Sequence, residues 1–273
     1  MKLAVLKETD AGERRVAASP ETVKRFAGWD AEISIEAGAG APAGMPDADF
    51  EAVGATIAPS RTAAVQGADV IMAVRAPDPA SLSGAKAGAI LAAILNPFQA
   101  EDTLSGYADA GLTAMAMDFM PRITRAQSMD VLSSQANLAG YRAVLDAAHE
   151  YGRGFPMMMT AAGTVSAAKL FVMGVGVAGL QAIATGRRLG AQVSATDVRA
   201  ATREQIESLG AKAIFVKDVE GIEGEGTGGY ASEMSEEYKA AQAKLVSDHI
   251  ARQDIVITTA LIPGRPAPRL ISD

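Results

Sequence analysis

Residues 169–199 read KLFVMGVGVAGLQAIATGRRLGAQVSATDVR, and they carry the clearest signal of the fold in this chain. An apolar strand leads into Gly174-x-Gly176-x-x-Gly179, an apolar helical run follows, and a second apolar strand ends at Asp197. In a dinucleotide-binding turn the first glycine permits a tight bend, the second lets a pyrophosphate approach the backbone, and the third lets the helix pack against its strand. The helix N-terminus then offers unpaired N–H groups and a positive dipole end to the phosphates. This order of features predicts a nucleotide-binding β–α–β unit.

Asp197 lies 21 residues after Gly176, at the end of the second expected strand. An acid in this place accepts hydrogen bonds from the adenosine ribose hydroxyls, and its charge repels a 2′-phosphate. The position therefore favours NAD(H) over NADP(H). An ordinary strand–turn–helix without a ligand stays open as the alternative, because a glycine triplet alone is weak evidence.

The composition of the 273-residue chain excludes several classes of protein. With 49% hydrophobic and 21% charged residues it can bury a core, as one large or two ordinary domains. A net charge of −7 without a basic cluster argues against nucleic-acid binding. The absence of cysteine excludes disulfides, thiolate nucleophiles and Cys-ligated metals, and we expect no metal site.

Neither the N-terminus nor the long apolar stretch of the chain suggests a membrane protein. The N-terminal sequence MKLAVLKETD becomes charged after six residues, which does not fit a signal peptide. Residues 155–184 are apolar and long enough to cross a bilayer, but Lys169 and several glycines interrupt them. We interpret this stretch as a linker, a buried parallel strand and a packed helix, and expect no direct membrane insertion.

The first half of the chain alternates strand-like and helix-like segments. Ser19-Pro20 is a good helix start, with a capping side chain before a proline at the first position. Such alternation predicts a mostly parallel sheet covered by helices. The expected strands are 2–6, 31–36, 69–74, 89–95 and 112–117, and the expected helices lie near 20–28, 47–53, 61–66, 99–110 and 134–151.

The second half continues the α/β pattern. After the strand, helix and strand of residues 169–197 we expect strands at 211–216 and 254–260, with helices near 201–209 and 232–252. The fold class is therefore α/β, with two Rossmann-like doubly wound parallel-sheet subdomains. We place them at 1–133 and 157–273, joined by a connecting helix and hinge at 134–156. Two further strands would complete the second sheet, so we expect it to be incomplete at its C-terminal end.

The methionine triplet Met157-Met158-Met159 stands at the expected hinge. Methionine is flexible and polarisable, and it commonly fills irregular gaps in a core. We therefore interpret the triplet as adaptable apolar packing rather than as a functional feature.

A polar stretch, PRITRAQSMD at 121–130, follows the strand expected at 112–117. It holds two arginines, a glutamine, a serine and an aspartate near the carboxyl edge of a sheet, where α/β proteins bind ligands. A solvated loop with a local Arg–Asp pair explains the same residues. The residues alone leave both interpretations open.

The sequence offers no convincing general base. Its two histidines, His149 and His249, each lie beside an acid in a helical pattern, and we expect both to be exposed. A dehydrogenase acting on an alcohol or amine normally needs such a base. Hydride transfer directly between two nicotinamides needs none. The segment GEGTGG at 224–229 fits a flexible surface loop, and Tyr230 after it could cover a bound nucleotide.

Three segments together resemble one family. They are RAQSMDVLSSQANLAGYRAV, FPMMMTAAGTV with GVGVAGLQAIATGRRLGAQVSATDVRAAT, and GGYASEM with ITTALIPGRPAP. From KLAVLKE to its last residue the chain resembles the NAD(H)-binding domain I, or α subunit, of proton-translocating NAD(P) transhydrogenase. The resemblance implies a homodimer that binds NADH and passes hydride to NADP⁺ on a domain III. It also implies a proton-conducting membrane domain II, which would hold the chain at the cytoplasmic side of the inner membrane through its partners.

The resemblance also implies roles for residues. By this resemblance the pyrophosphate is bound by Gly174, Gly176, Val177 and Gly179. The adenosine ribose is surrounded by Asp197, Val198 and Arg199. Thr259 and Leu261 line the adenosine side, and Gly229-Tyr230 belongs to a loop that closes on the nucleotide. The nicotinamide and its ribose are surrounded by the expected catalytic residues Gln127, Arg122 and Asp130, together with Ser133. Ser128 and Met129 complete the expected cofactor-binding residues.

Two other functions remain as alternatives. Alanine dehydrogenase shares the N-terminal pattern KLAVLKE…RRVAASP, and Arg75 stands near the catalytic lysine expected in that family. However, Asn96 stands where that family has a catalytic histidine, which argues against this alternative. A non-catalytic NAD-binding module is the third possibility.

Overall fold

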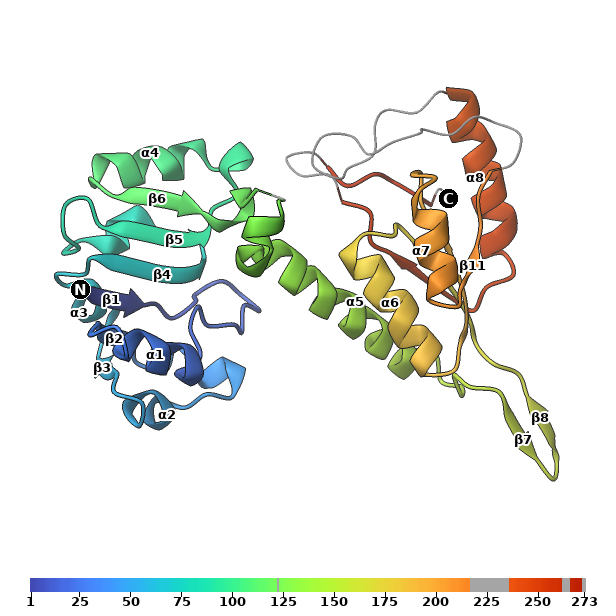
Figure 1. Ribbon diagram of the computed structural model, residues 1–273, viewed down its shortest axis with the longest axis horizontal. Coiled ribbons are helices and arrows are strands. Elements are labelled where there is room, and N and C mark those ends of the chain that lie inside the picture. Colours follow the sequence, from blue (N-terminus) through green and yellow to red (C-terminus); the bar gives the residue numbers. More distant parts are fainter. Residues whose placement is uncertain (122, 217–235, 262–265, 272–273) are drawn as a thin grey trace. The chain divides into compact units, whose positions relative to one another are not determined.

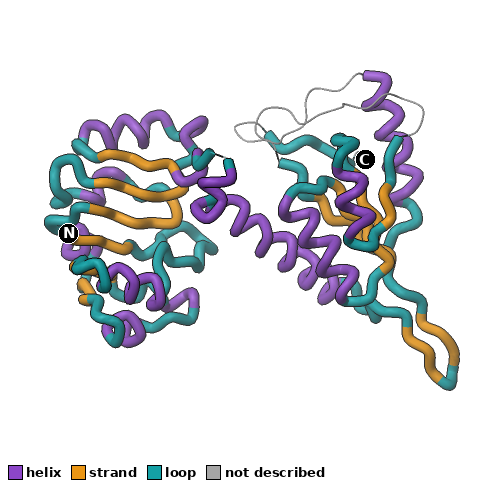
Figure 2. Tube along the Cα trace, in the orientation of Figure 1, coloured by secondary structure: helices purple, strands orange, loops and turns teal. Residues whose placement is uncertain are grey.

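The computed structural model describes residues 1–121, 123–216, 236–261 and 266–271. The chain divides into two compact units, Met1–Val131 and Leu132–Asp273, which we describe separately. Both units are α/β, with parallel main sheets, as the sequence predicted (Figures 1 and 2).

The first unit is built on a six-stranded parallel sheet in the order β3-β2-β1-β4-β5-β6. Its strands are β1 Lys2–Val5, β2 Glu32–Glu36, β3 Thr56–Ala58, β4 Val70–Arg75, β5 Ile90–Ile94 and β6 Thr113–Ala116. Its α-helices are α1 Pro20–Ala27, α2 Asp47–Glu51, α3 Arg61–Val65 and α4 Glu101–Asp109. The chain reverses its direction of travel across the sheet between β1 and β4, so their carboxyl ends form the switch point of the sheet.

Alternating residues of the first sheet pack against different helices. Ala4 belongs to a core cluster with residues of α3 and α4, whereas its neighbour Val5 packs with residues of α1 and α2. Successive strand side chains point to opposite faces, so helices cover both faces of this sheet. As predicted, Ser19 caps α1, accepting a hydrogen bond from the N–H of Thr22 at 3.3 Å. The sequence did not predict β3, which has only three residues.

The second unit holds a four-stranded parallel sheet in the order β11-β10-β9-β12. Its strands are β9 Lys169–Met173, β10 Gln192–Thr196, β11 Lys212–Ala213 and β12 Ile255–Thr258. Its helices are α5 Val131–Glu150, α6 Val177–Arg188, α7 Thr202–Ser208 and α8 Glu236–Ile250. Among the described residues no strand lies beyond β12, which forms an edge of the sheet.

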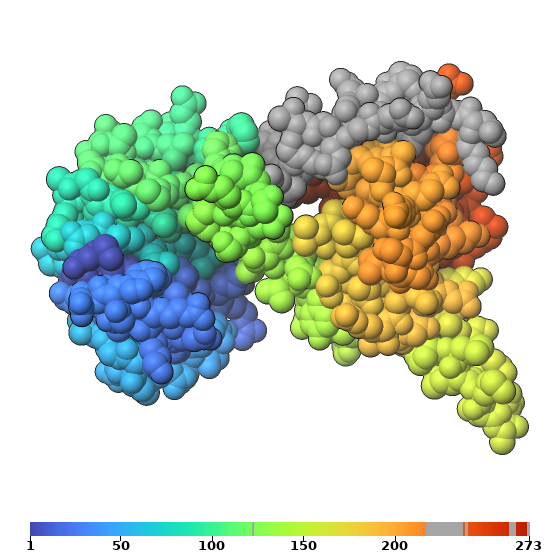
Figure 3. Space-filling view, viewed as in Figure 1, coloured from blue at the N-terminus to red at the C-terminus, as the bar shows by residue number. Residues whose placement is uncertain are grey.

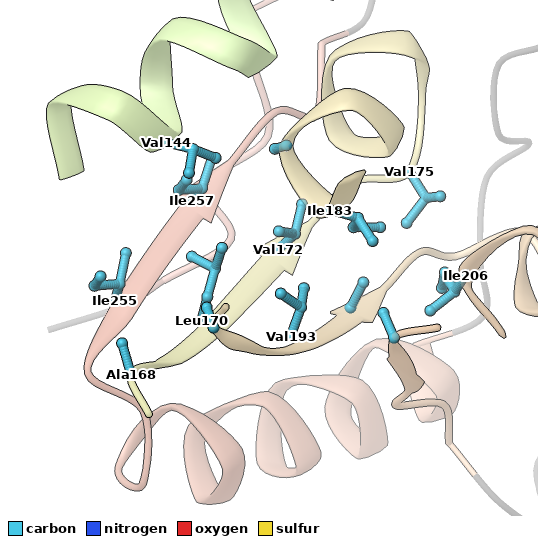
Figure 4. Packing of buried hydrophobic residues seen from close by; sticks show 14 of the residues in the cluster. Val144, Ala168, Leu170, Val172, Val175, Ile183, Val193, Ile206, Ile255 and Ile257 are labelled. Carbon is cyan, nitrogen blue, oxygen red and sulfur yellow. The ribbon is translucent and has the colours of Figure 1, made fainter. Parts of the chain in front are cut away.

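The core of the second unit lies mainly on one face of this sheet. Leu170 and Val172 of β9 pack there with Val144 of α5 and Ile183 of α6. Figure 4 shows Val144 next to Ile257 of β12. Helix α5 therefore packs on the second sheet, next to the expected nucleotide turn.

The opposite face is covered by α8. There Phe171 packs with Val246, and the His249 ring meets the Phe171 ring at a centroid distance of 4.6 Å. The Nε2 atom of His249 lies 2.8 Å from the Ser194 hydroxyl. The expectation that His249 is exposed is thus wrong: tertiary packing, which the neighbouring residues could not reveal, half-buries the ring.

Partial burial lowers the pKa of His249 below its usual value, and the nearby charges of Arg252 and Lys212 lower it further. Burial disfavours the charged form of an imidazole, and neighbouring cations act in the same direction. The neutral ring is therefore the form that packs from α8 against the sheet.

Residues 158–165 form an antiparallel hairpin of β7 Met158–Thr160 and β8 Gly163–Val165. In Figure 3 this yellow-green segment stands off the rest of its unit. Met159 is 80% exposed, so the interpretation of the methionine triplet as core packing is wrong. The linker expected before the strand at Lys169 contains this hairpin, which lies inside the second unit. In the part of the chain that the structure describes, no helix is both long and apolar enough to cross a membrane.

Candidate nucleotide-binding site

The glycine turn lies between the end of β9 and the start of α6. Gly174 has φ +96°, a conformation that favours glycine, and a Cβ there would approach the backbone N of Ala260 to 2.9 Å. A Cβ on Gly179 would overlap the carbonyl group of Gly174. These two glycines are therefore required by the fold itself.

Gly176 is different from the other two glycines of the motif. Apart from Gly176 and its own chain neighbours, no atom of the described residues lies within 4 Å of the position its Cβ would take. It caps α6 without a side-chain hydrogen bond, and the first turn of the helix holds no acidic residue. The start of α6 is therefore uncrowded by the described residues, and no side chain caps its N–H groups or its positive dipole end, which is the arrangement that binds a phosphate group.

Thr259, directly after β12, supports the turn from the neighbouring strand. Its Oγ1 donates to the carbonyl of Gly174 at 2.8 Å, and its N–H donates to the carbonyl of Met173 at 2.9 Å. The two bonds fix the bend against the sheet. The family resemblance implied that Thr259 lines the adenosine side, but it did not indicate this supporting bond.

Asp197 follows β10 and its carboxylate is bound on both oxygens. Oδ2 accepts from the N–H of Val175 at 2.7 Å, inside the glycine turn. Oδ1 accepts from the backbone N–H and the Nε of Arg199, both at 2.9 Å, and the Arg199 terminal nitrogen donates to Oδ2 at 3.0 Å. One carboxylate thereby ties the end of β10 to the turn that follows β9.

The electrostatics of this carboxylate combine two opposing effects. Burial raises the pKa of Asp197, but hydrogen bonds from Arg199 and from two backbone N–H groups outweigh it and hold the pKa below its usual value. Asp197 is therefore ionised at neutral pH. A negative charge beside an open helix N-terminus is suited to hydroxyl donors rather than to an additional phosphate.

The remaining predicted residues of this unit are less tightly defined. Val198 is half-buried, and Leu261 is 67% exposed beyond the end of β12. Val177 opens α6 and is partly exposed. Gly229 and Tyr230 lie outside the described residues.

The polar stretch of the first unit forms a short 3₁₀ helix, Thr124–Met129. The buried side chain of Ala126 anchors it, while Gln127, Ser128 and Met129 are exposed. Asp130 caps the helix through its N–H, which donates to the carbonyl of Gln127 at 3.3 Å. Arg122 lies outside the described residues, and Ser133 belongs to the second unit, in the first turn of α5.

One residue that sequence reasoning missed lies behind the turn. A Cβ on Gly140, in the middle of α5, would overlap the carbonyl of Ala178 in the first turn of α6. The two helices cross here with their backbones in close contact. A glycine inside a long helix was the available signal, since glycine is unfavourable there without a packing reason.

Arg75 and Asn96, on which the alanine dehydrogenase alternative depends, take part in other contacts. Arg75, at the end of β4, lies 3.7 Å from the Asp10 carboxylate and 4.0 Å from that of Glu13. Asn96 adopts a left-handed conformation with φ 47°, and its N–H donates to Asp118 at 2.8 Å. An amide in this place cannot act as an acid or base.

Comparison with known proteins agrees with this geometry. Residues 4–139 match the family model "Alanine dehydrogenase/PNT, N-terminal domain", and residues 143–273 match its C-terminal counterpart. The chain is 52% identical over 278 residues to an NAD(P) transhydrogenase subunit alpha protein of Rhodospirillum rubrum, covering all of this chain and 72% of that protein. The chain therefore belongs to the NAD(P) transhydrogenase α-subunit family.

Comparison with solved structures supports the same family and the same fold. The crystal structure of transhydrogenase from Sinorhizobium meliloti is 56% identical, with a TM-score of 0.89 over 99% of this chain and 73% of that one. An L-alanine dehydrogenase structure is 25% identical, with a TM-score of 0.76 over 100% of this chain and 69% of that one. The family resemblance and the fold class expected from the sequence are both confirmed.

Proposed function

We propose that this chain is the NAD(H)-binding component of a proton-translocating transhydrogenase and binds NAD(H) at the Gly174–Gly179 turn. The observation that carries the proposal is the open N-terminus of α6 at Gly176, with the ionised carboxylate of Asp197 beside it. The first suits a pyrophosphate and the second suits ribose hydroxyls. The names of the transhydrogenase relatives support the same conclusion.

NADH supplies the hydride, which passes directly to NADP⁺ held on a partner domain III. The first turn of α6 binds the pyrophosphate, and Asp197 with Val198 and Arg199 surrounds the adenosine ribose. Gln127, with Arg122 and Asp130, orients the nicotinamide. Because a hydride moves from one nicotinamide to another, no side chain has to accept or donate a proton.

The assembly that we propose has two copies of this chain, the NADP(H)-binding domain III and a membrane domain II. Proton movement through domain II would drive the hydride transfer. The chain itself would be peripheral to the membrane, on the cytoplasmic side, attached through these partners.

Calorimetric titration with NADH tests the binding site. Replacing Asp197 with alanine should weaken NADH binding by at least about tenfold, because a charged acceptor is lost. Asp254→Ala is the matched control, since this carboxylate also accepts a backbone N–H, from Lys169 at 2.8 Å, but at the opposite end of β9. Equal NADH affinity in wild type and Asp197→Ala would contradict the assignment.

Transhydrogenation with added membrane and NADP-binding partners tests the reaction. Gln127→Ala should slow hydride transfer more than it weakens NADH binding, because orientation acts in the transition state. Gln192→Ala, an exposed glutamine at the amino end of β10, serves as control. Alanine-dependent reduction of NAD⁺ by the chain would favour alanine dehydrogenase instead, and no transhydrogenation with all partners present would favour a non-catalytic module.

A further inference from the structure

A carboxylate joins the carboxyl ends of β5 and β6 in the first unit. The paired register of these two strands ends at Ala93 and Ala116. Beyond it, Asp118 accepts the N–H of Leu95 at 3.0 Å through Oδ1 and the N–H of Asn96 at 2.8 Å through Oδ2. This pair of hydrogen bonds, which we call the Asp118 clamp, continues the connection between the strands where the backbone ladder stops.

Aromatic rings connect the same two turns a second time. Phe98, shortly after β5, and Phe119, next to Asp118, have ring centroids 5.1 Å apart and a tilt of 58°. Both rings are more than half exposed, whereas the Asp118 side chain is half-buried. Hydrogen bonds to an ionised carboxylate are stronger than those between neutral groups. The Asp118 clamp is therefore the main connection between the turns, and the ring contact adds to it.

The Asp118 clamp fixes the start of the segment that leads to Gln127. Asp118 lies in the 3₁₀ turn Met117–Phe119, directly after β6, and the 3₁₀ helix Thr124–Met129 follows. Ala126, 3% exposed, anchors that helix with one methyl group, while the Gln127 side chain itself is exposed. The carboxylate adds two charge-assisted hydrogen bonds to the main chain of a buried strand. The direction in which the segment leaves the sheet therefore depends on Asp118.

We propose that Asp118 is a positioning residue for hydride transfer, which holds Gln127 in place by fastening the turn after β6 to the end of β5. The inference rests on the proposed function, since it takes Gln127 as the residue that orients the nicotinamide. Hydride transfer needs a close and aligned approach of donor and acceptor, and a misplacement of about 1 Å can cost about a hundredfold in rate. Asp118 acts through the main chain, without touching the nucleotide.

Transfer rates of Asp118 variants, with the membrane and NADP-binding partners added and NADH saturating, test the proposal. Asp118→Ala removes both hydrogen bonds and should slow the transfer about tenfold, a partial displacement on that scale. Asp118→Asn keeps an oxygen that can accept one of the two N–H groups, so it should recover part of the rate. NADH affinity, measured by calorimetry, should change by less than about threefold, because orientation acts in the transition state.

Asp69→Ala is the matched control. The Asp69 carboxylate also accepts a backbone N–H in the first sheet, from Lys2 at 2.7 Å, but at the amino ends of β1 and β4. This variant should lose stability in urea unfolding and still transfer hydride at the wild-type rate. If it slows the transfer as much as Asp118→Ala does, a general loss of stability explains the effect and the proposal fails.

A double-mutant cycle decides whether Asp118 acts through Gln127. Asp118→Ala should slow the transfer by a smaller factor in the Gln127→Ala background than in wild type, because the side chain to be misplaced is already gone. Equal factors in both backgrounds, or wild-type rates in the folded Asp118 variants, overturn the proposal. Asp118→Asn and Asp118→Ser carry the same cycle should the alanine variant fail to fold, as judged by circular dichroism. These failures leave the proposed function intact as long as wild type binds NADH, whereas a folded wild-type chain that binds none overturns both.

Discussion

Replacing Gly140 with alanine tests whether α5 positions the nucleotide turn. Gly140 is buried, and the group that its Cβ would overlap is the backbone carbonyl of Ala178, one residue into α6. No change of side-chain rotamer can relieve a clash with backbone. The start of α6 must therefore move away from α5, at the end of the helix that faces the proposed pyrophosphate.

Two opposing effects set the size of the change in stability. Alanine is more favourable than glycine inside a helix by about 1 kcal/mol. Overpacking a well-packed contact costs typically about 1–3 kcal/mol. Because the added Cβ would clash with backbone, we take the upper end of the overpacking cost. After subtracting the gain in helix propensity, we expect a net loss of about 2 kcal/mol in the free energy of unfolding. Displacing the first turn should weaken NADH binding by about tenfold, equivalent to about 1.4 kcal/mol.

Gly186→Ala provides the matched control. Gly186 is also a buried helical glycine, but its Cβ would meet side chains, Leu170 Cδ2 at 2.5 Å and Val193 Cγ2 at 3.2 Å, toward the far end of α6. Urea unfolding should show that both variants lose stability, and calorimetry should show weakened NADH binding for Gly140→Ala alone. The reasoning is refuted if Gly140→Ala is as stable as the helix propensity of alanine alone would make it, or if it binds NADH like Gly186→Ala.

Three further substitutions, at Thr259, His249 and Asn96, test other contacts of the fold. Thr259→Val removes the bond to the Gly174 carbonyl and should cost about 1 kcal/mol of stability in urea unfolding, with weaker NADH binding; Thr259→Ser should retain both. Because the pKa of His249 is lowered, the unfolded chain binds more protons, so stability should fall as the pH drops below about 6.5. His249→Gln, which can still bond to Ser194, should flatten this pH dependence, and an unchanged slope would contradict the assignment. Asn96→Ala should destabilise by about 1–2 kcal/mol because of the left-handed backbone, whereas Asn96→Gly should be nearly neutral.

The regions of the fold that the sequence predicted are those whose signals are local. In β9, apolar residues form one continuous run because both faces of the strand are buried, by α6 on one side and α8 on the other. The glycines of the turn follow in fixed order because each answers a separate steric demand. Such a stretch can be recognised without knowing what packs on it.

The regions that the sequence did not predict depend on distant contacts or on weak patterns. The β7–β8 hairpin has the pattern of an apolar run, yet its methionines are exposed, and its turn uses Thr160 Oγ1 donating to the carbonyl of Gly163 rather than an Asn-Gly pair. The close approach of Gly140 to α6 joins residues 38 positions apart, a separation at which no periodicity operates. The resemblance, not the residue pattern, supplied the roles of the stretch around Gln127, and those roles stay predictions.

Asp197 shows what a motif omits even when it is recognised correctly. The motif provides a carboxylate at the end of β10, but the structure shows that its acceptor sites already have donors. Ribose hydroxyls would therefore exchange with Arg199 rather than add new bonds, and an exchange contributes little net free energy. Most of the affinity for NADH must then come from the pyrophosphate at the open end of α6. Truncating Asp197 will overstate its contribution, because the measured loss includes displacement of the glycine turn once the Val175 N–H has lost the carboxylate that holds it.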